Sequence, residues 1–244
     1  MSETISFPGV GGGELVIVAH GAPSDPEPQQ QALEALATEV AALLPGDWRV
    51  GGATLARKGA LETALAGMDR PLVYPFFMAQ GWFTGTELPR RLAAAGRGEA
   101  RQLLPFGLDP ALPGLVMQAA RQGAEQAGLA PGEAGLVLAA HGSAVSRGSA
   151  TATTALAREI AACGTFARVE AGYVEEAPYL AAIACGMGPS VCLPLFAQRA
   201  GHVTRDVPRA LEQAGFEGPL LPPIGAHPGV PALIAAAAAR AVTE

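Results

Sequence analysis

The sequence has 244 residues, of which 50% are hydrophobic and 16% charged, with 16 Lys and Arg against 22 Asp and Glu and a formal net charge of −6. The apolar content excludes a disordered chain, and the length allows one large domain or two domains of about 120 residues. The acidic balance excludes nucleic acid and anionic membranes as the main partners, because binding to phosphates needs a basic surface.

Along the chain, short apolar runs typical of buried strands alternate with Ala-rich stretches that favour helix. The predicted strands are Glu14–Ala19, Trp48–Thr54, Pro71–Phe77, Arg101–Pro105, Gly135–Ala140, Ala167–Tyr173, Ser190–Leu195 and Pro219–Pro222. The predicted helices are Pro28–Leu44, Leu88–Ala95, Pro110–Gln126, Thr151–Ala162 and Pro208–Ala214. This alternation predicts an α/β fold with parallel sheets covered by helices.

The chain also repeats itself. LVIVAHGAP at residues 15–23 returns as LVLAAHGSA at residues 136–144, and the block that starts at Tyr74 returns from Leu193. A third block, LPFGLDP from Leu104, returns as PPIGAHP from Pro222. Three matched blocks in the same order predict an internal duplication. We therefore expect two flavodoxin-like domains, residues 1–130 and 131–244, each with a four-stranded parallel sheet flanked by helices.

Polar side chains follow the strands of the second copy at their carboxyl ends, where ligands of open parallel sheets bind. His141 comes directly after the first strand, Glu175 and Glu176 after the second, and His202 in the loop after the third. Imidazole and carboxylate groups suit divalent first-row metals, and three protein ligands leave positions open for exchange. We expect a transient metal site here, although each histidine taken alone is also consistent with a hydrogen-bonded loop residue.

The first copy lacks most of these groups. It keeps His20 after its first strand, but Trp82 stands in the place of His202, and Ala56 and Arg57 stand in the places of the two glutamates. This pattern indicates a degenerate site in the first copy and the working site in the second. For His20 a structural role ranks before a vestigial or alternative metal site, and His227 is expected to be structural.

The motifs of the second copy resemble those of the class II tetrapyrrole chelatases of the CbiX/SirB type. They are the strand followed by His141–Ser143, the GYVEEAP segment at Gly172–Pro178, and LPLFAQRAGHVTRDVP at Leu193–Pro208. The resemblance spans nearly the whole chain, once per half. It implies a chelatase-like fold and a lyase that inserts a divalent metal, Co²⁺ first or Fe²⁺, into sirohydrochlorin in cobalamin or sirohaem biosynthesis.

The resemblance also implies the site residues. His141 and His202 would bind the metal and act in catalysis, with Glu175 as their acidic partner and Glu176 as the alternative. Such chemistry needs a base and loosely held ligands, and neutral histidine can serve as both. The metal would be a substrate, with no tightly bound cofactor. A carrier that binds the tetrapyrrole or the metal without catalysis is the alternative function.

A substrate with eight carboxylates calls for cationic and stacking groups at the cleft. The residues expected to bind it are Ser143, Arg147, Arg199, Arg205 and Trp82. Arginine can pair with a carboxylate through two hydrogen bonds, and Trp82 can stack on a macrocycle. Ser143 is equally consistent with a helix cap, and Arg147 and Arg205 with solvated helix starts.

The cysteines and the apolar runs bear on location. The three cysteines have no CxxC spacing, so neither a disulfide framework nor a zinc or iron–sulfur site is expected. The longest apolar run, Ala232–Ala239, is far shorter than the ~20 residues that span a bilayer. We expect a cytoplasmic protein without a membrane or nucleic-acid partner.

Overall fold

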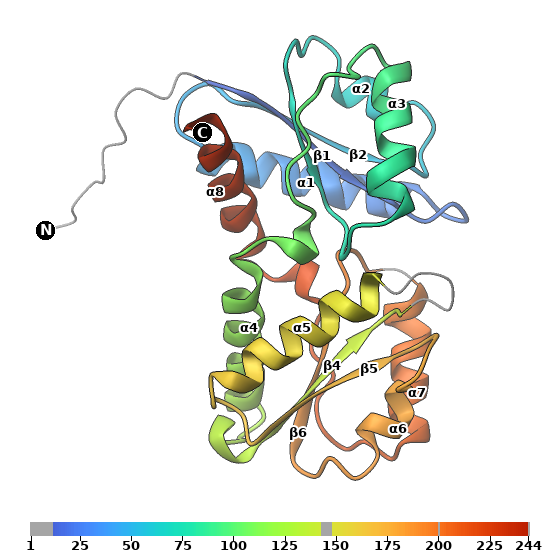
Figure 1. The fold of residues 1–244 in the computed structure, drawn as a ribbon, viewed down its shortest axis with the longest axis vertical. Coiled ribbons are helices and arrows are strands. Elements are labelled where there is room, and N and C mark those ends of the chain that lie inside the picture. The colour runs from blue at the N-terminus through green and yellow to red at the C-terminus, as the bar shows by residue number, and fades with distance from the viewer. Residues whose placement is uncertain (1–11, 143–147, 200, 244) are drawn as a thin grey trace, which may run out of the picture.

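The computed structural model describes residues 12–142, 148–199 and 201–243, except for the side chains of residues 148, 149 and 202. In this part of the chain, two three-stranded parallel sheets form, each flanked by helices. Figure 1 shows the two halves one above the other, with the first strand and the last helix of the described chain both in the upper half. The predicted α/β class is confirmed.

The first half of the chain supplies the upper sheet. Its elements are β1 (Glu14–Ala19), α1 (Glu27–Leu43), β2 (Arg49–Thr54), α2 (Ala60–Ala64), β3 (Leu72–Pro75), the π-helical turn η1 (Phe83–Glu87), α3 (Leu88–Ala94), the 3-10 turn η2 (Phe106–Leu108) and α4 (Leu112–Gln126). The strand order is β2-β1-β3, with Ile17 of β1 opposite Gly52 and Tyr74.

The second half repeats this order after the 3-10 turn η3 (Pro131–Glu133). Its elements are β4 (Gly135–Ala140), α5 (Gly148–Ala162), β5 (Arg168–Tyr173), α6 (Leu180–Ala184), β6 (Ser190–Pro194), the π-helical turn η4 (His202–Asp206), α7 (Val207–Gln213), the 3-10 turn η5 (Ile224–Ala226) and α8 (Val230–Thr243). The sheet order β5-β4-β6 matches that of the first half.

The prediction of a fourth strand in each sheet is wrong, because each sheet has three strands among the residues that the structure describes. At 101–105 and 219–222 the described chain forms one parallel bridge each, Val73 with Gln102 and Cys192 with Leu220. The second bridge shows two hydrogen bonds, from Cys192 N–H to Pro219 O at 2.9 Å and from Leu221 N–H to Cys192 O at 2.8 Å. Prolines at positions 105, 222 and 223 follow directly and have no N–H to donate, so the ladder stops.

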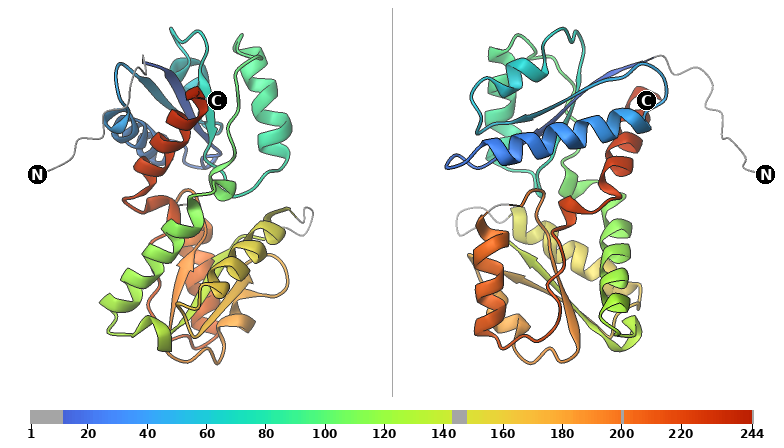
Figure 2. Two further views of the ribbon diagram at one scale, coloured as in Figure 1. Left: turned by 60° about the vertical axis from the view of Figure 1, so that its left-hand side comes forward. Right: turned by 180° about the vertical axis from the view of Figure 1, so that it is seen from behind.

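The last helix of each half packs on the other half. Helix α8 lies against α1 and β3 of the upper sheet, and α4 lies against β6 and α5 of the lower one. Figures 1 and 2 show the exchange: α8, in dark red, stands beside α1, and α4, in green, stands beside α5. The segments that cross between the halves run through η2 and η5.

The exchanged helices join the two sheets into one core. One buried cluster contains Leu15 and Ile17 from β1, Leu136 and Leu138 from β4, and apolar residues of α1, α4 and α8 such as Ile234. The opposite faces of the sheets have separate cores under α2 and α3 and under α6 and α7. Because strand side chains alternate between faces, both faces of β1 and β4 are apolar.

The sequence boundary predicted near residue 131 falls at the turn η3 between α4 and β4. We propose that residues 1–130 and 131–244 are repeats of one unit. The last helix of each repeat, α4 or α8, covers the sheet of the other repeat. Among the described residues, no helix is long and apolar enough to cross a membrane.

Candidate active site

Each central strand ends in a histidine held by the same turn. The Nδ1 atoms of His20 and His141 each lie 2.7 Å from the carbonyl oxygen of the following glycine, Gly21 or Gly142. These glycines have φ angles of 76° and 73°, a conformation that favours glycine. Because a carbonyl only accepts hydrogen bonds, Nδ1 carries the proton in both neutral rings, and Nε2 carries the lone pair.

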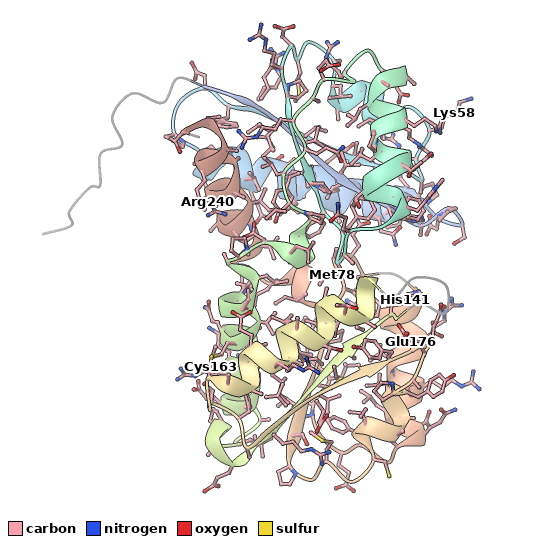
Figure 3. All side chains as sticks on the ribbon, viewed as in Figure 1. Lys58, Met78, His141, Cys163, Glu176 and Arg240 are labelled. Carbon is pink, nitrogen blue, oxygen red and sulfur yellow. The ribbon has the colours of Figure 1, made fainter. Side chains whose placement is uncertain are left out.

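Both histidines line one cavity of about 500 Å³ between the two halves. Its wall from the first half contains His20, Gly21, Ala22, Pro23, Phe76, Phe77, Met78 and Phe83, and its wall from the second half contains His141, Ala197, Gln198, Gly201 and Arg205. Figure 3 shows Met78 and His141 at this junction. We call this cavity the cleft.

Among the residues that the structure describes, a carboxylate accompanies only the histidine of the second half. Glu175 Oε1 lies 3.6 Å from His141 Nε2, and both side chains are partly exposed. Glu176 covers the same turn from another side, because a Cβ atom at Gly142 would lie 2.9 Å from both Cγ and Oε1 of Glu176. The geometry therefore brings together the predicted His141–Glu175 pair, and places Glu176 on the backbone of the turn.

His202 opens the π-helical turn η4 as Phe83 opens η1, so Phe83 stands in its place in the first half, and the predicted equivalence of Trp82 is wrong by one residue. Its side chain lies outside the described part of the structure, so the position of its imidazole is a prediction from sequence. Among the side chains that the structure describes, no group of three His, Cys, Asp or Glu residues converges as a metal site. The described part of the predicted ligand set is His141 with Glu175.

The predicted substrate-binding residues are distributed over three places. Arg205 lines the cleft, and its guanidinium lies over Gly201. Arg199 instead lines a neighbouring cavity behind the Ala197–Gln198 segment, together with His227. Trp82 is 60% exposed and packs edge-on against Phe83, with ring centroids 5.0 Å apart. Ser143 and Arg147 lie outside the described residues.

Sequence reasoning missed most of the apolar wall of the cleft. Phe76, Phe77 and Met78 follow β3 and line the cavity beside Phe83. The sequence shows an aromatic pair, Phe76 and Phe77, but places it inside the predicted strand Pro71–Phe77 and not in the loop that follows. Flat apolar side chains of this kind suit a planar aromatic ligand.

Gln198 joins the two walls of the cleft. Its Oε1 accepts a hydrogen bond from Gly21 N–H at 3.1 Å, and its Nε2 donates to the carbonyl of Gln29 at 3.3 Å. Gln29 in turn donates to the carbonyl of Arg199 at 3.3 Å. These bonds tie the loop that leads to His202 to the loop that holds His20. Neither sequence periodicity nor the repeat predicts them.

An ionic cluster anchors the turn that presents Phe83. Glu87 accepts hydrogen bonds from Arg90 at 2.9 Å and from Arg91 at 2.7 Å, and Arg91 also donates to the carbonyl of Leu55 at 2.6 Å. Hydrogen bonds from Arg90 and then Arg91 lower the pKa of Glu87 from 4.5 to about 2. The carboxylate thus remains charged and fixes η1 against the end of β2.

Known proteins resemble this chain in sequence and in structure. A family model described as CbiX matches residues 135–241. A solved structure of CbiX, described as the terminal enzyme for biosynthesis of siroheme in denitrifying bacteria, is 49% identical, covers 93% of this chain and 99% of that chain, and superposes with a TM-score of 0.86. No curated protein matches the chain.

Two further solved structures share the architecture. DR2241 from Deinococcus radiodurans, described as a multi-domain protein with structural similarity to chelatases, is 26% identical with a TM-score of 0.71; the match covers 93% of this chain and 54% of that one. SirB from Bacillus subtilis with Fe³⁺ is 17% identical with a TM-score of 0.73, and the match covers 93% of this chain and 94% of that chain. At this low identity, SirB supports the fold alone.

Proposed function

Because the chain belongs to the CbiX family, we propose that it is a sirohydrochlorin chelatase, which inserts a divalent metal ion into sirohydrochlorin in the cleft between its halves. The single observation that carries this proposal is the His141–Glu175 pair, 3.6 Å apart, whose histidine lines a cavity that both halves form. The relative that is 49% identical over nearly its whole length supports the same activity.

The reaction exchanges two pyrrole N–H protons for one M²⁺ ion, so the site must hold a partly dehydrated cation and accept protons. His141 Nε2 carries the lone pair that a metal needs, because Nδ1 donates to Gly142 O. Glu175 beside the same nitrogen would be a second ligand, and its charge offsets that of the cation. In this proposal His202, next along the rim, supplies a further ligand.

The cleft also has the two surfaces that the macrocycle needs. Phe76, Phe77 and Phe83 offer flat apolar area for the tetrapyrrole ring. Arg205 is exposed at the same cavity and pairs with a peripheral carboxylate. A macrocycle larger than this cavity extends its carboxylate arms beyond it, where the exposed Trp82 could contact them; Arg147 stays a prediction from sequence.

For the metal, we propose Fe²⁺ as the ion used in the cell and Co²⁺ as an accepted alternative. A related CbiX that acts in siroheme biosynthesis supports iron. Histidine and carboxylate ligands accept both ions, so selectivity depends on supply as well as on the protein. The Co²⁺ expected first from sequence therefore stays a prediction, to be settled by assay.

The test is an absorbance assay of sirohydrochlorin with Co²⁺ or Fe²⁺, at protein concentrations well below that of the macrocycle. A chelatase converts many macrocycles per protein, whereas a carrier stops at one. We expect His141→Ala to lower the rate about 10²-fold or more. His227→Asn, outside the cleft, is the matched control, because Asn can still accept the hydrogen bond from Gly229 N–H. Unchanged insertion by His141→Ala would overturn the assignment.

A further inference from the structure

We propose that His20 is a second catalytic histidine, which accepts the pyrrole protons while His141 with Glu175 holds the metal. This inference rests on the proposed chelatase function and divides its chemistry between the halves. It replaces the expectation that His20 is structural. Three features of the described residues carry it: the orientation of the ring, its place in the cleft, and the charges around it.

The orientation leaves a basic nitrogen available at His20. Its Nδ1–H donates to Gly21 O, and its ring packs perpendicular to Phe83 at a centroid distance of 4.3 Å. These two contacts fix the imidazole. Its Nε2 forms no hydrogen bond or ion pair with any residue that the structure describes. Because this nitrogen is not among the buried atoms that lack a partner, it is accessible from the cleft.

The place of His20 is opposite His141. The two rings come from β1 and β4, the central strands of different sheets, and both line the cleft. A flat macrocycle that enters between the halves would then have one imidazole on each face. A metal that approaches one face and protons that leave from the other do not compete for the same nitrogen.

The charges separate the two roles. Glu175 N–H donates to His141 O at 3.0 Å, and at the equivalent position Ala56 N–H donates to His20 O at 2.9 Å. Ala56 therefore occupies the place of Glu175 without a carboxylate. The next residue, Arg57, is engaged by Glu27 at 3.2 Å and Glu34 at 3.6 Å. Without a carboxylate, His20 is a poor ligand for a divalent cation, but it remains a competent proton acceptor.

The proton transfer needs no other reagent. One pyrrole N–H bond breaks, its proton moves to His20 Nε2, and its electron pair stays on the nitrogen and binds the metal. The imidazolium then gives the proton to water, because His20 is half-buried at an open cavity. The second N–H reacts in the same way, so that M²⁺ replaces two protons and no redox change occurs.

Two substitutions at residue 20 test the roles of the two ring nitrogens separately. Asn places an amide N–H near the position of Nδ1, so His20→Asn can keep the bond to Gly21 O and lacks a base. Gln places its amide near the position of Nε2, so His20→Gln keeps a polar group there without imidazole basicity. We expect both variants to lower the insertion rate about 10²-fold. They should bind Co²⁺ alone, followed by its visible absorption, as the wild type does.

Exogenous imidazole provides the second measurement. It should restore part of the rate of His20→Ala, because it can fill the vacated volume and accept the proton. Phe83→Ala is the matched control, since it opens space beside the same ring but keeps the base, so imidazole should not accelerate it.

Wild-type rates in both residue-20 variants would overturn the inference, and so would weaker Co²⁺ binding in them or equal rescue of Phe83→Ala. Absence of metal insertion by the wild type would instead overturn the proposed function itself.

Discussion

The turns after β1 and β4 hold the same histidine in the same way, yet the groups beside these histidines differ. In both turns Nδ1 lies 2.7 Å from a glycine carbonyl, and the glycine has a positive φ. Within the described part of the chain, only His141 has a carboxylate beside it, whereas His20 has the aromatic ring of Phe83. The scaffold that aims the imidazole is thus the same in both halves, and the electrostatics are not.

This difference shows what each half contributes. A divalent cation needs negative charge nearby, and a tetrapyrrole ring needs apolar area. The second half supplies Glu175 and the cationic Arg205, while the first supplies Phe76, Phe77 and Phe83. A cleft built from these two unlike walls can bind a metal and a macrocycle together.

The largest expected effect comes from the glycines of the crossing segments. Gly225 N–H donates to Phe196 O and Gly107 N–H to Phe77 O, at 3.0 and 2.9 Å. A Cβ at residue 225 would lie 1.9 Å from Ala197 O, and at residue 107 it would lie 1.7 Å from Met78 O. We expect Gly225→Ala and Gly107→Ala each to lower the free energy of unfolding by about 3 kcal/mol, as overpacking does.

The two variants should differ in how they lose activity. Gly225→Ala displaces the segment that leads to His202 and should abolish most metal insertion per folded molecule. Gly107→Ala displaces Met78 and the apolar wall, and should mainly raise the KM for sirohydrochlorin. Thermal unfolding and the insertion assay measure the two effects. Identical kinetic defects in both variants would show that the halves contribute alike.

The strands could be predicted from the sequence, but the arrangement of the helices around them could not. The strands around Ile17 and Leu138 and the histidine that ends each central strand were predicted, because apolar periodicity and a repeated HG motif are local signals. The crossing of α4 and α8 was not, since a helix such as Val230–Thr243 shows an apolar face but not which sheet it covers.

The candidate site divides in the same way. The pairing of His141 with Glu175 follows from neighbouring parallel strands, so it was predictable. The position of His20 in the same cleft depends on how the halves face each other, and the position of Arg199 behind the Ala197–Gln198 segment depends on the path of one loop. The short helices α2 and α6 have five residues each, too few for periodicity to reveal them.

The next effect in size concerns the carboxylate that distinguishes the halves. We expect Glu175→Gln to weaken Co²⁺ binding about 10–100-fold, because the carboxylate lies beside the metal-binding nitrogen of His141 and offsets the metal charge. Titration of the protein with Co²⁺ measures this. Glu176→Gln is the matched control, since that side chain covers Gly142, and it should change the affinity less.

The converse change adds a carboxylate to the first half. Ala56→Glu introduces a carboxylate at the position in the first half that matches Glu175. It should create a second, weaker Co²⁺ site at His20, and His20→Asn in the same protein should remove that site.

For the first pair of variants, equal weakening of Co²⁺ binding by Glu176→Gln and Glu175→Gln would show that the acidic partner of His141 is misassigned.

The smallest expected effect concerns Glu87, whose aligned residue in the second half is Asp206. Bonding to Arg90 and Arg91 lowers the pKa of Glu87 from 4.5 to about 2 in the folded protein. A lowered pKa stabilises the fold fully above pH 4.5, and this contribution is lost as the pH falls toward 2. The wild type should therefore unfold at a higher temperature than Glu87→Gln at pH 7, with a difference that shrinks as the solution is acidified.

Thermal unfolding of both proteins between neutral and acidic pH checks this expectation. Glu125→Gln is the control, because Glu125 is exposed and its nearest oxygen lies 4.0 Å from Arg121, so its loss should change the unfolding temperature little at any pH. A difference between wild type and Glu87→Gln that stays constant with pH would contradict the expectation. The turn that presents Phe83 would then be held by packing, and the ionic cluster of the first half would not be what fixes the apolar wall of the cleft.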